Sequence, residues 1–152
     1  SGRSPTMKST SPQERHLLQL DPTAFLADRE LIRVLNDHAT PIVCKTDRIL
    51  FHQDDPAVGL YILLEGKVTL SMDSHQVQPI LSGEASDGSI LGLPGLISDQ
   101  PYSLTAIARA GARVSFLARA EFHELMHSNP VLGFKILQVL AAEVRSARKA
   151  LY

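Results

Sequence analysis

Several residue types are scarce or missing in this chain of 152 residues. There is no tryptophan, aromatic residues make up only 5%, and Cys44 is the single cysteine. One cysteine excludes an internal disulfide and a cysteine-ligated iron–sulfur cluster, and it is typical of a reducing compartment such as the cytoplasm. No apolar run approaches the roughly 20 residues that a membrane-spanning helix needs, so we do not expect an integral membrane protein.

An excess of charge of one sign is also lacking. The chain has 15 basic and 16 acidic residues, which gives a formal net charge of −1. Proteins that bind nucleic acid or membrane surfaces electrostatically typically carry a strong basic excess, so we expect neither partner. With 44% hydrophobic residues, the chain is long enough to form one domain with a substantial core.

The apolar pattern predicts helices at both ends and short strands between them. Residues 14–20 and the stretch from Phe25 to Leu35 show helical spacing, and Asp21 or Thr23 is placed to cap the second helix. Between Thr40 and Leu117, short β-branched or aromatic runs are separated by turn residues about every eight to twelve positions, which is typical of an antiparallel roll. We expect a disordered tail or tag at 1–13, N-terminal helices at 14–40, a β-roll at 41–118 and C-terminal helices at 119–152, with 14–152 as one domain.

The stretch from Ser89 to Thr105 is unusual because it is apolar yet contains two glycines and two prolines. Pro94 and Gly95 exclude a regular strand at its centre. It predicts either a tight corner between two strands or a short helix in the wall of the roll. In the second case, backbone amides near Gly92 would face a cavity and form a potential anion site.

A long helix is predicted from Pro130 to the C-terminus. A helix of about 20 residues spans about 30 Å, more than one face of a small roll covers. Part of its apolar stripe is therefore expected to meet a second copy of the chain, the alternative being that it packs wholly on its own domain. The expected dimer interface consists of Leu132, Ile136, Val139, Leu140, Val144, Ala147 and Leu151.

Several short motifs resemble the cyclic-nucleotide-binding domain of catabolite-activator and fumarate-nitrate (Crp/Fnr) type regulators. Gln53-Asp-Asp-Pro56 is similar to that family's turn after the second strand, and Glu65-Gly-Lys-Val68 to its tight hairpin. The resemblance covers about residues 20–150. It implies a mainly β jelly roll (a double-stranded β-helix) with flanking helices and a long C-terminal helix. In DNA-binding relatives a helix-turn-helix domain follows this helix, whereas this chain ends at Tyr152.

The resemblance also implies a ligand site in the stretch from Ser89 to Thr105, which matches the family's phosphate-binding cassette. Leu93 stands where the family has the glutamate that holds the ribose, and Tyr102 where it has the arginine that holds the cyclic phosphate. Each lost charge-assisted bond is worth roughly 1.5–3 kcal/mol, so the two departures cost about 3–6 kcal/mol. The candidate ligand-binding residues are Leu91, Gly92, Leu93, Pro101, Tyr102, Ser103 and Thr105.

These observations predict a non-enzymatic regulatory module that senses a ligand and forms a homodimer, without standard binding of cyclic AMP or cyclic GMP. Its ligand would be an uncharged or amphipathic small molecule, or the pocket would be vestigial. One alternative is the sensor half of a transcription regulator that does bind a cyclic nucleotide. We expect no cofactor.

An alternative of another class comes from His123-Glu124-x-x-His127, which spells the zinc-peptidase pattern on a predicted helix, with Glu143 as an imaginable third ligand. Phe122 and Leu125 instead favour an ordinary helix with one buried face, so no metal site and no catalytic residues are predicted. Cys44 fits a small core residue better than a redox sensor.

Overall fold

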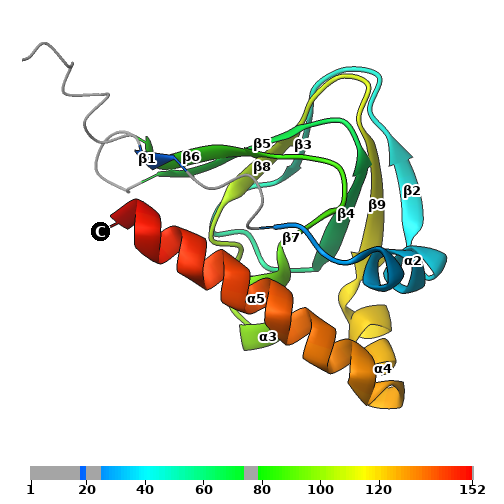
Figure 1. Cartoon of the computed structure of the whole chain (residues 1–152). Helices are drawn as coiled ribbons and strands as arrows, with labels where there is room; N and C mark the ends of the chain where they lie inside the picture. The colour runs from blue at the N-terminus through cyan, green and yellow to red at the C-terminus, as the bar shows by residue number, and fades with distance from the viewer. Residues whose placement is uncertain (1–17, 20–24, 74–78, 152) are drawn as a thin grey trace, which may run out of the picture.

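The computed structural model describes residues 18–19, 25–73 and 79–151. This part of the chain forms two facing sheets with helices along one side (Figure 1), in the orders β1-β6-β5-β8-β3 and β2-β9-β4-β7. All pairings are antiparallel except β1 with β6, so the predicted antiparallel roll is confirmed. The strands are β1 (Leu18–Gln19), β2 (Thr40–Val43), β3 (Arg48–Phe51), β4 (Gly59–Glu65), β5 (Val68–Asp73), β6 (Pro79–Ala85), β7 (Ser89–Leu91), β8 (Thr105–Ala108) and β9 (Arg113–Ala118).

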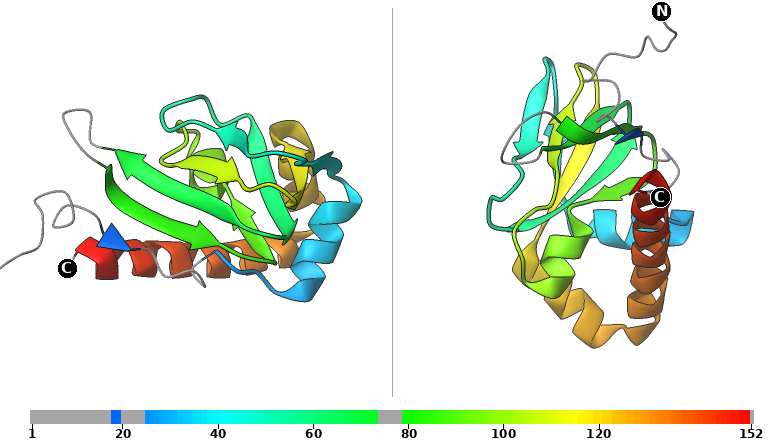
Figure 2. Two further views of the ribbon diagram at one scale, coloured as in Figure 1. Left: turned by 90° about the horizontal axis from the view of Figure 1, so that it is seen from above. Right: turned by 90° about the vertical axis from the view of Figure 1, so that its left-hand side faces the viewer.

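The helices are α2 (Arg29–Asp37), α3 (Leu93–Ser98), α4 (Arg119–Ser128) and α5 (Pro130–Leu151). Two views show α5 running along the length of the roll, with α4 leading into it (Figure 2). Pro130 is the first residue of α5, where its missing N–H costs nothing. The predicted long terminal helix is therefore confirmed.

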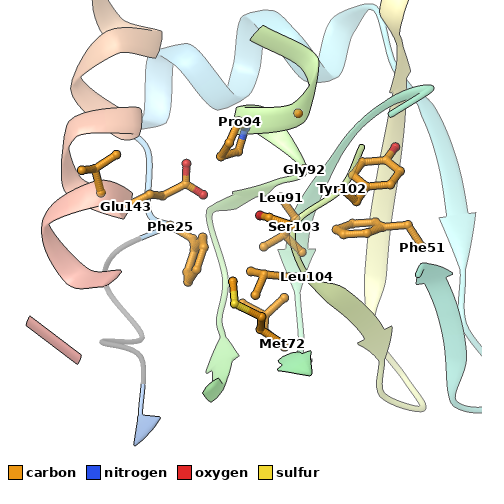
Figure 3. A pocket seen from close by; sticks show the side chains of 13 residues that line it. Phe25, Phe51, Met72, Leu91, Gly92, Pro94, Tyr102, Ser103, Leu104 and Glu143 are labelled. Atoms are coloured by element: carbon orange, nitrogen blue, oxygen red, sulfur yellow. The ribbon is translucent and has the colours of Figure 1, made fainter. Parts of the chain in front are cut away.

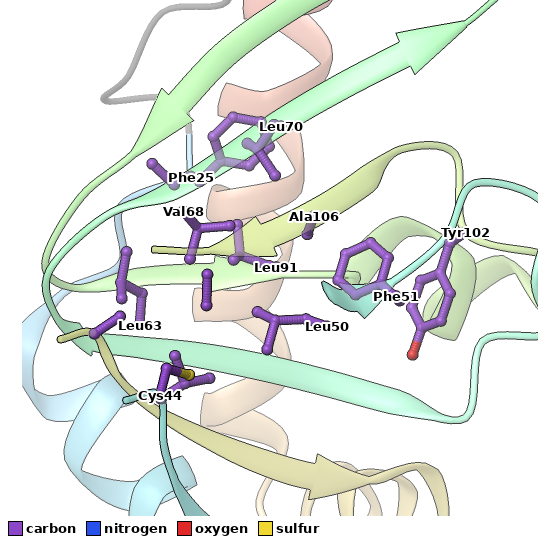
Figure 4. Packing of buried hydrophobic residues seen from close by; sticks show 14 of the residues in the cluster. Phe25, Cys44, Leu50, Phe51, Leu63, Val68, Leu70, Leu91, Tyr102 and Ala106 are labelled. Carbon is purple, nitrogen blue, oxygen red and sulfur yellow. The ribbon is translucent and has the colours of Figure 1, made fainter. Parts of the chain in front are cut away.

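A first apolar cluster fills the space between the two sheets (Figure 4). It contains Phe51, Leu63, Leu70 and Tyr102, and Cys44 lies buried within it. Cys44 is a small core residue, as its apolar strand predicted. This cluster forms the floor of the cavity described below.

A second cluster lies between the roll and the helices. Strand β4 separates the two clusters, because Leu60 and Ile62 belong to the second and Leu63 to the first. Both faces of β4 are thus covered, which explains why its sequence is continuously apolar rather than alternating. Leu132, Ile136 and Val139 of α5 are buried in the second cluster and attach the helix to its own domain.

The second helix was predicted to include Phe25, and this start was wrong. The helix begins at Arg29, and its N-cap is Asp28, whose side chain accepts a hydrogen bond from the Leu31 N–H at 2.8 Å. Phe25 and Leu26 precede it in an extended segment that bonds to the chain around Ser89. Burial of the Phe25 ring in the roll outweighs its helical spacing.

One further expectation differs from the structure. Leu18–Gln19 was predicted to be helical but forms β1, which pairs in parallel with β6; the rest of 14–20, the cap candidates Asp21 and Thr23, and the tail at 1–13 lie outside the described residues. The stretch 82–88 is polar in sequence, and β6 continues into it as far as Ala85. Buried Gly83 and Ala85 alternate there with less buried polar residues, the period of a strand with one solvent face.

Candidate functional site

A cavity of about 150 Å³ lies between the roll, α3 and α5 (Figure 3). Its walls come from five segments that are far apart in sequence: the turn before α2, β3, β5, the stretch from β7 to Leu104, and α5. The lining is mostly apolar. The lining residues are Phe25, Phe51, Leu70, Met72, Leu91, Gly92, Pro94, Gly95, Tyr102, Ser103, Leu104, Glu143 and Val144.

The turn from β7 into α3 depends on Gly92. Its φ is +86°, a conformation that other residues adopt only with strain, and it is the N-cap of α3. A Cβ at this position would lie 2.9 Å from Tyr102 Cε1. Of the two predicted alternatives for this stretch, the short helix is therefore the one found.

Both the ring and the hydroxyl group of Tyr102 make contacts inside the protein. It is 3% exposed, and its ring stacks on Phe51 with a centroid distance of 4.0 Å. Its hydroxyl donates to Gly59 O at 2.6 Å and accepts from Gly59 N at 3.2 Å. Burial raises the pKa of this phenol above its usual value, so it stays neutral. The ring lines the cavity, while the hydroxyl is bound to the backbone of β4.

Only glycine fits at position 59, the partner of the Tyr102 hydroxyl, because β9 lies too close for a side chain. A Cβ there would lie 2.4 Å from Leu117 O and 2.5 Å from an atom of the Phe116 ring. Both distances are shorter than non-bonded atoms allow, so a side chain at position 59 would require a shift of the neighbouring strand β9.

The segment from Tyr102 to Thr105 is fixed to the turn after β3. Asp54 N donates to Tyr102 O at 2.8 Å, and Tyr102 N donates to Asp55 O at 2.9 Å. Gln53 N donates to the Thr105 hydroxyl at 2.9 Å. The Thr105 hydroxyl thus supports the segment rather than lining the cavity.

The structure brings some of the predicted ligand-binding residues together and separates others. Leu91, Gly92, Tyr102 and Ser103 line the cavity, whereas Leu93, Pro101 and Thr105 do not. Leu93 is fully buried in the second cluster, beneath the helices. It therefore does not contribute to the cavity wall, although the sequence analysis named it as a candidate ligand-binding residue.

The most unusual lining residue, Glu143 of α5, was missed as a pocket residue. It is 8% exposed, and its Oε2 atom has no hydrogen-bond partner among the described residues. Its carboxyl group points towards the cavity, near Phe25 and Pro94 (Figure 3). Burial raises the pKa of this carboxyl group to about 8. Buried polar atoms without a partner are rare in proteins and call for an explanation.

The charges around the cavity do not favour an anion. None of the lining residues that the structure describes is lysine, arginine or histidine. The polar side chains that line the cavity, apart from the Tyr102 phenol bound to Gly59, are the carboxyl group of Glu143 and the hydroxyl group of Ser103. A negatively charged phosphate would therefore meet an acidic group and no cation.

The other candidates from the sequence lie elsewhere. His123, Glu124 and His127 are exposed on α4, and the described residues contain no cluster of three or more His, Cys, Asp or Glu side chains that could hold a metal ion. Glu143 is buried at the cavity and is not grouped with these histidines. No helix in the described part of the chain has the length and apolarity to cross a membrane.

The outer face of α5 carries a second apolar stripe, of which the sequence analysis predicted only Val144 as an interface residue. Phe134 is 65% exposed, Leu137 60% and Val144 56%. With Ala141, these residues follow the 3-4-3 spacing of a coiled-coil seam. Of the predicted interface, Val144 is exposed on this stripe. The other predicted residues are not: Leu132, Ile136 and Val139 are buried in their own domain, Leu140 is partly buried, and the side chains of Ala147 and Leu151 lie outside the described residues.

Comparison with solved structures shows the same fold in bacterial regulators. The Thermus thermophilus catabolite activator protein matches 82% of this chain with 21% identity and a TM-score of 0.70, and this chain spans 58% of its length. A transcriptional regulator from Thermotoga maritima matches 79% of this chain and 94% of its own, with 23% identity and a TM-score of 0.65. The c-di-GMP responsive global regulator of Xanthomonas campestris matches 82% of this chain and 59% of its own, with 21% identity and a TM-score of 0.62.

No curated protein sequence matches the chain significantly. The family model described as the cyclic nucleotide-binding domain matches residues 41–129, more than half of the chain. The fold shared with these solved structures agrees with this match, and the chain belongs to the cyclic nucleotide-binding domain family.

Proposed function

We propose that this protein is a regulatory module that senses a small ligand in the cavity and forms a homodimer through α5, without holding cyclic AMP or cyclic GMP by the family's usual contacts. The observation that carries the proposal is that α5 itself supplies part of the cavity wall, through Glu143 and Val144. A ligand in the cavity would touch the same helix that offers an apolar face to a partner.

The residues at the two anchoring positions argue against the usual mode of cyclic nucleotide binding. The Tyr102 hydroxyl is bound to Gly59, and Leu93 is buried away from the cavity. The loss of two charge-assisted bonds costs about 3–6 kcal/mol, or on the order of a hundred- to ten-thousand-fold in affinity. The cavity of about 150 Å³ is also smaller than the roughly 300 Å³ at which ordinary ligand pockets begin.

The expected mechanism is a shift in the position of α5 relative to the roll when the ligand binds. Lys135 and the buried residues Leu132 and Ile136 attach the first half of the helix to the domain. Contacts with the ligand would act on the later turn that carries Glu143. Bacterial regulators of this fold provide the analogy, since the Xanthomonas protein is named as responsive to c-di-GMP.

The ligand-binding part is tested by isothermal titration of cyclic AMP and cyclic GMP into the wild-type protein. We expect a dissociation constant of about 0.1 mM or weaker, since the lost contacts shift a micromolar affinity by two to four orders of magnitude. Micromolar binding of either nucleotide would show that the cavity holds a phosphate in another way. It would favour the alternative of a cyclic-nucleotide sensor. A Leu93→Glu/Tyr102→Arg variant is less suitable, because it would bury a carboxylate beneath the helices.

The dimer is tested by sedimentation of a Phe134→Lys/Leu137→Lys variant. A charge on each of two neighbouring seam positions should convert a dimer into a monomer without loss of helical content, because both side chains are exposed. The matched control is Val43→Lys, at an exposed apolar position on β2 far from α5. A wild-type protein that sediments as a monomer at about 100 μM would contradict the proposed dimer.

A further inference from the structure

Glu143 is a buried acid that no described residue explains. Its Oε2 atom lacks a hydrogen-bond partner, and the side chain reaches the cavity from α5 (Figure 3). A polar group left unpaired in an apolar wall costs free energy, and a ligand that pairs with it removes this cost.

The surroundings of Glu143 keep its carboxyl group uncharged. Phe25, Leu91 and Pro94 are apolar, and the only ionisable group besides Glu143 among the lining residues is the Tyr102 phenol, which is bound to Gly59. On α5, the nearest charged side chain with a described position is the exposed Arg145, which borders a neighbouring surface groove. Burial is the single cause that raises the pKa of Glu143, to about 8.

A neutral carboxylic acid offers one O–H donor and one carbonyl acceptor on adjacent atoms. The complementary partner is an uncharged group with an acceptor beside a donor, such as an amide. An ammonium group would require ionisation of Glu143 and loss of water from both charges, with no further described donor to support the carboxylate. An anion would face the acid without any cation among the lining residues.

We propose that the cavity binds a small uncharged molecule whose polar end exchanges hydrogen bonds with the Glu143 carboxylic acid and whose apolar body lies against the cavity walls. This inference rests on the proposed ligand-sensing function and adds the chemical class of the ligand. The size of the cavity, about 150 Å³, indicates a molecule near a single ring, since a dry cavity of that volume admits benzene.

Three probes of nearly equal size and different charge test this class: benzamide (neutral), benzylamine (cationic) and benzoate (anionic). Binding is followed by chemical-shift changes of the protein at pH 7. We expect benzamide to bind most tightly of the three. Its affinity should stay constant below about pH 8 and fall tenfold per pH unit above it, as Glu143 ionises.

Two variants connect this result to Glu143. Glu143→Gln keeps a neutral donor and acceptor, so it should retain benzamide binding within about twofold and lose the fall above pH 8. Glu143→Leu should weaken benzamide about tenfold, because one net hydrogen bond is lost. Glu124→Leu, at an exposed position on α4, is the matched control and should bind like the wild type.

Several outcomes would overturn the proposal. One such outcome is that benzylamine binds more tightly than benzamide, that its affinity increases with pH, and that Glu143→Gln abolishes its binding. This result would show a cationic ligand. Benzoate binding best, or none of the probes binding to the wild type, would overturn it as well. Amide exchange in residues 130–145 separates this inference from the proposed function: benzamide binding with unchanged exchange would support the ligand class and contradict the sensing mechanism.

Discussion

Replacement of Glu143 by glutamine should change how the stability of the empty protein depends on pH. The carboxyl group has an ordinary pKa of 4.5 when the chain is unfolded and a pKa of about 8 in the folded protein. Between these values only the folded chain retains the proton, so unfolding releases it and rising pH favours the unfolded state. The contribution of Glu143 to stability is thus fully present below about pH 4.5, is lost progressively up to about pH 8, and is constant above that.

The size of the effect follows from these two values. Each pH unit within the interval costs about 1.4 kcal/mol, and allowance for incomplete titration at pH 5 leaves a loss of about 2.5 kcal/mol between pH 5 and pH 7. Glu143→Gln has no proton to lose, so it should gain this amount relative to the wild type over the same range. At about 3 °C per kcal/mol, the difference in melting temperature between the two proteins should grow by about 8 °C.

The assay is chemical or thermal unfolding of both proteins from pH 5 to pH 9. All other titrating groups are shared, so they cancel in the difference between the two curves. Glu124→Gln, an exposed change on α4, should follow the wild type at every pH. A Glu143→Gln difference that does not vary with pH would refute the reasoning, because it would mean that the carboxyl group is hydrated and ionised in the folded protein.

Three further changes test the structure around the cavity, each by urea unfolding. Tyr102→Phe removes the hydroxyl that pairs both backbone groups of Gly59, and should cost about 1–3 kcal/mol; a neutral effect would show that water replaces the hydroxyl. Gly92→Ala should cost about 1–3 kcal/mol, because φ is +86° and the new Cβ meets the Tyr102 ring; a stabilised variant would contradict this turn geometry. Asp28→Ala should cost about 1–2 kcal/mol through loss of the α2 cap to Leu31 and of the ion pair with Lys135, and Asp28→Asn should recover the part that the cap contributes.

The sequence was sufficient to predict the roll because its signals are local. Strands such as Arg48–Phe51 are short apolar runs between turn residues, and Pro130 stands where a helix can accept a proline. The helix predicted from Phe25 to Leu35 began too early, because the conformation of its first residues depends on contacts distant in sequence. Helical spacing at Phe25 and Leu26 says nothing about a distant strand, and contacts with the chain around Ser89 determine their conformation.

The candidate site could be predicted only in part. The stretch from Leu91 to Ser103 was identifiable from its glycines and prolines, but the direction of each side chain was not. Leu93 faces the helices because it starts α3. Glu143 lies 38 or more positions from the cassette residues, and only the placement of α5 brings it to the cavity. Its position on an otherwise apolar helix face was the signal that could have indicated a buried acid.

The attachment of α5 has a mechanical consequence. Leu132, Ile136 and Val139 bury apolar surface, and Lys135 donates to Asp28 at 2.8 Å, so the first half of the helix is held by favourable contacts. The next buried position towards the C-terminus is Glu143, whose burial is unfavourable while it is unpaired. Between Leu132 and Glu143, the free energy needed to detach the helix therefore falls, and the turn beside the cavity opens at lower cost than the turns before it.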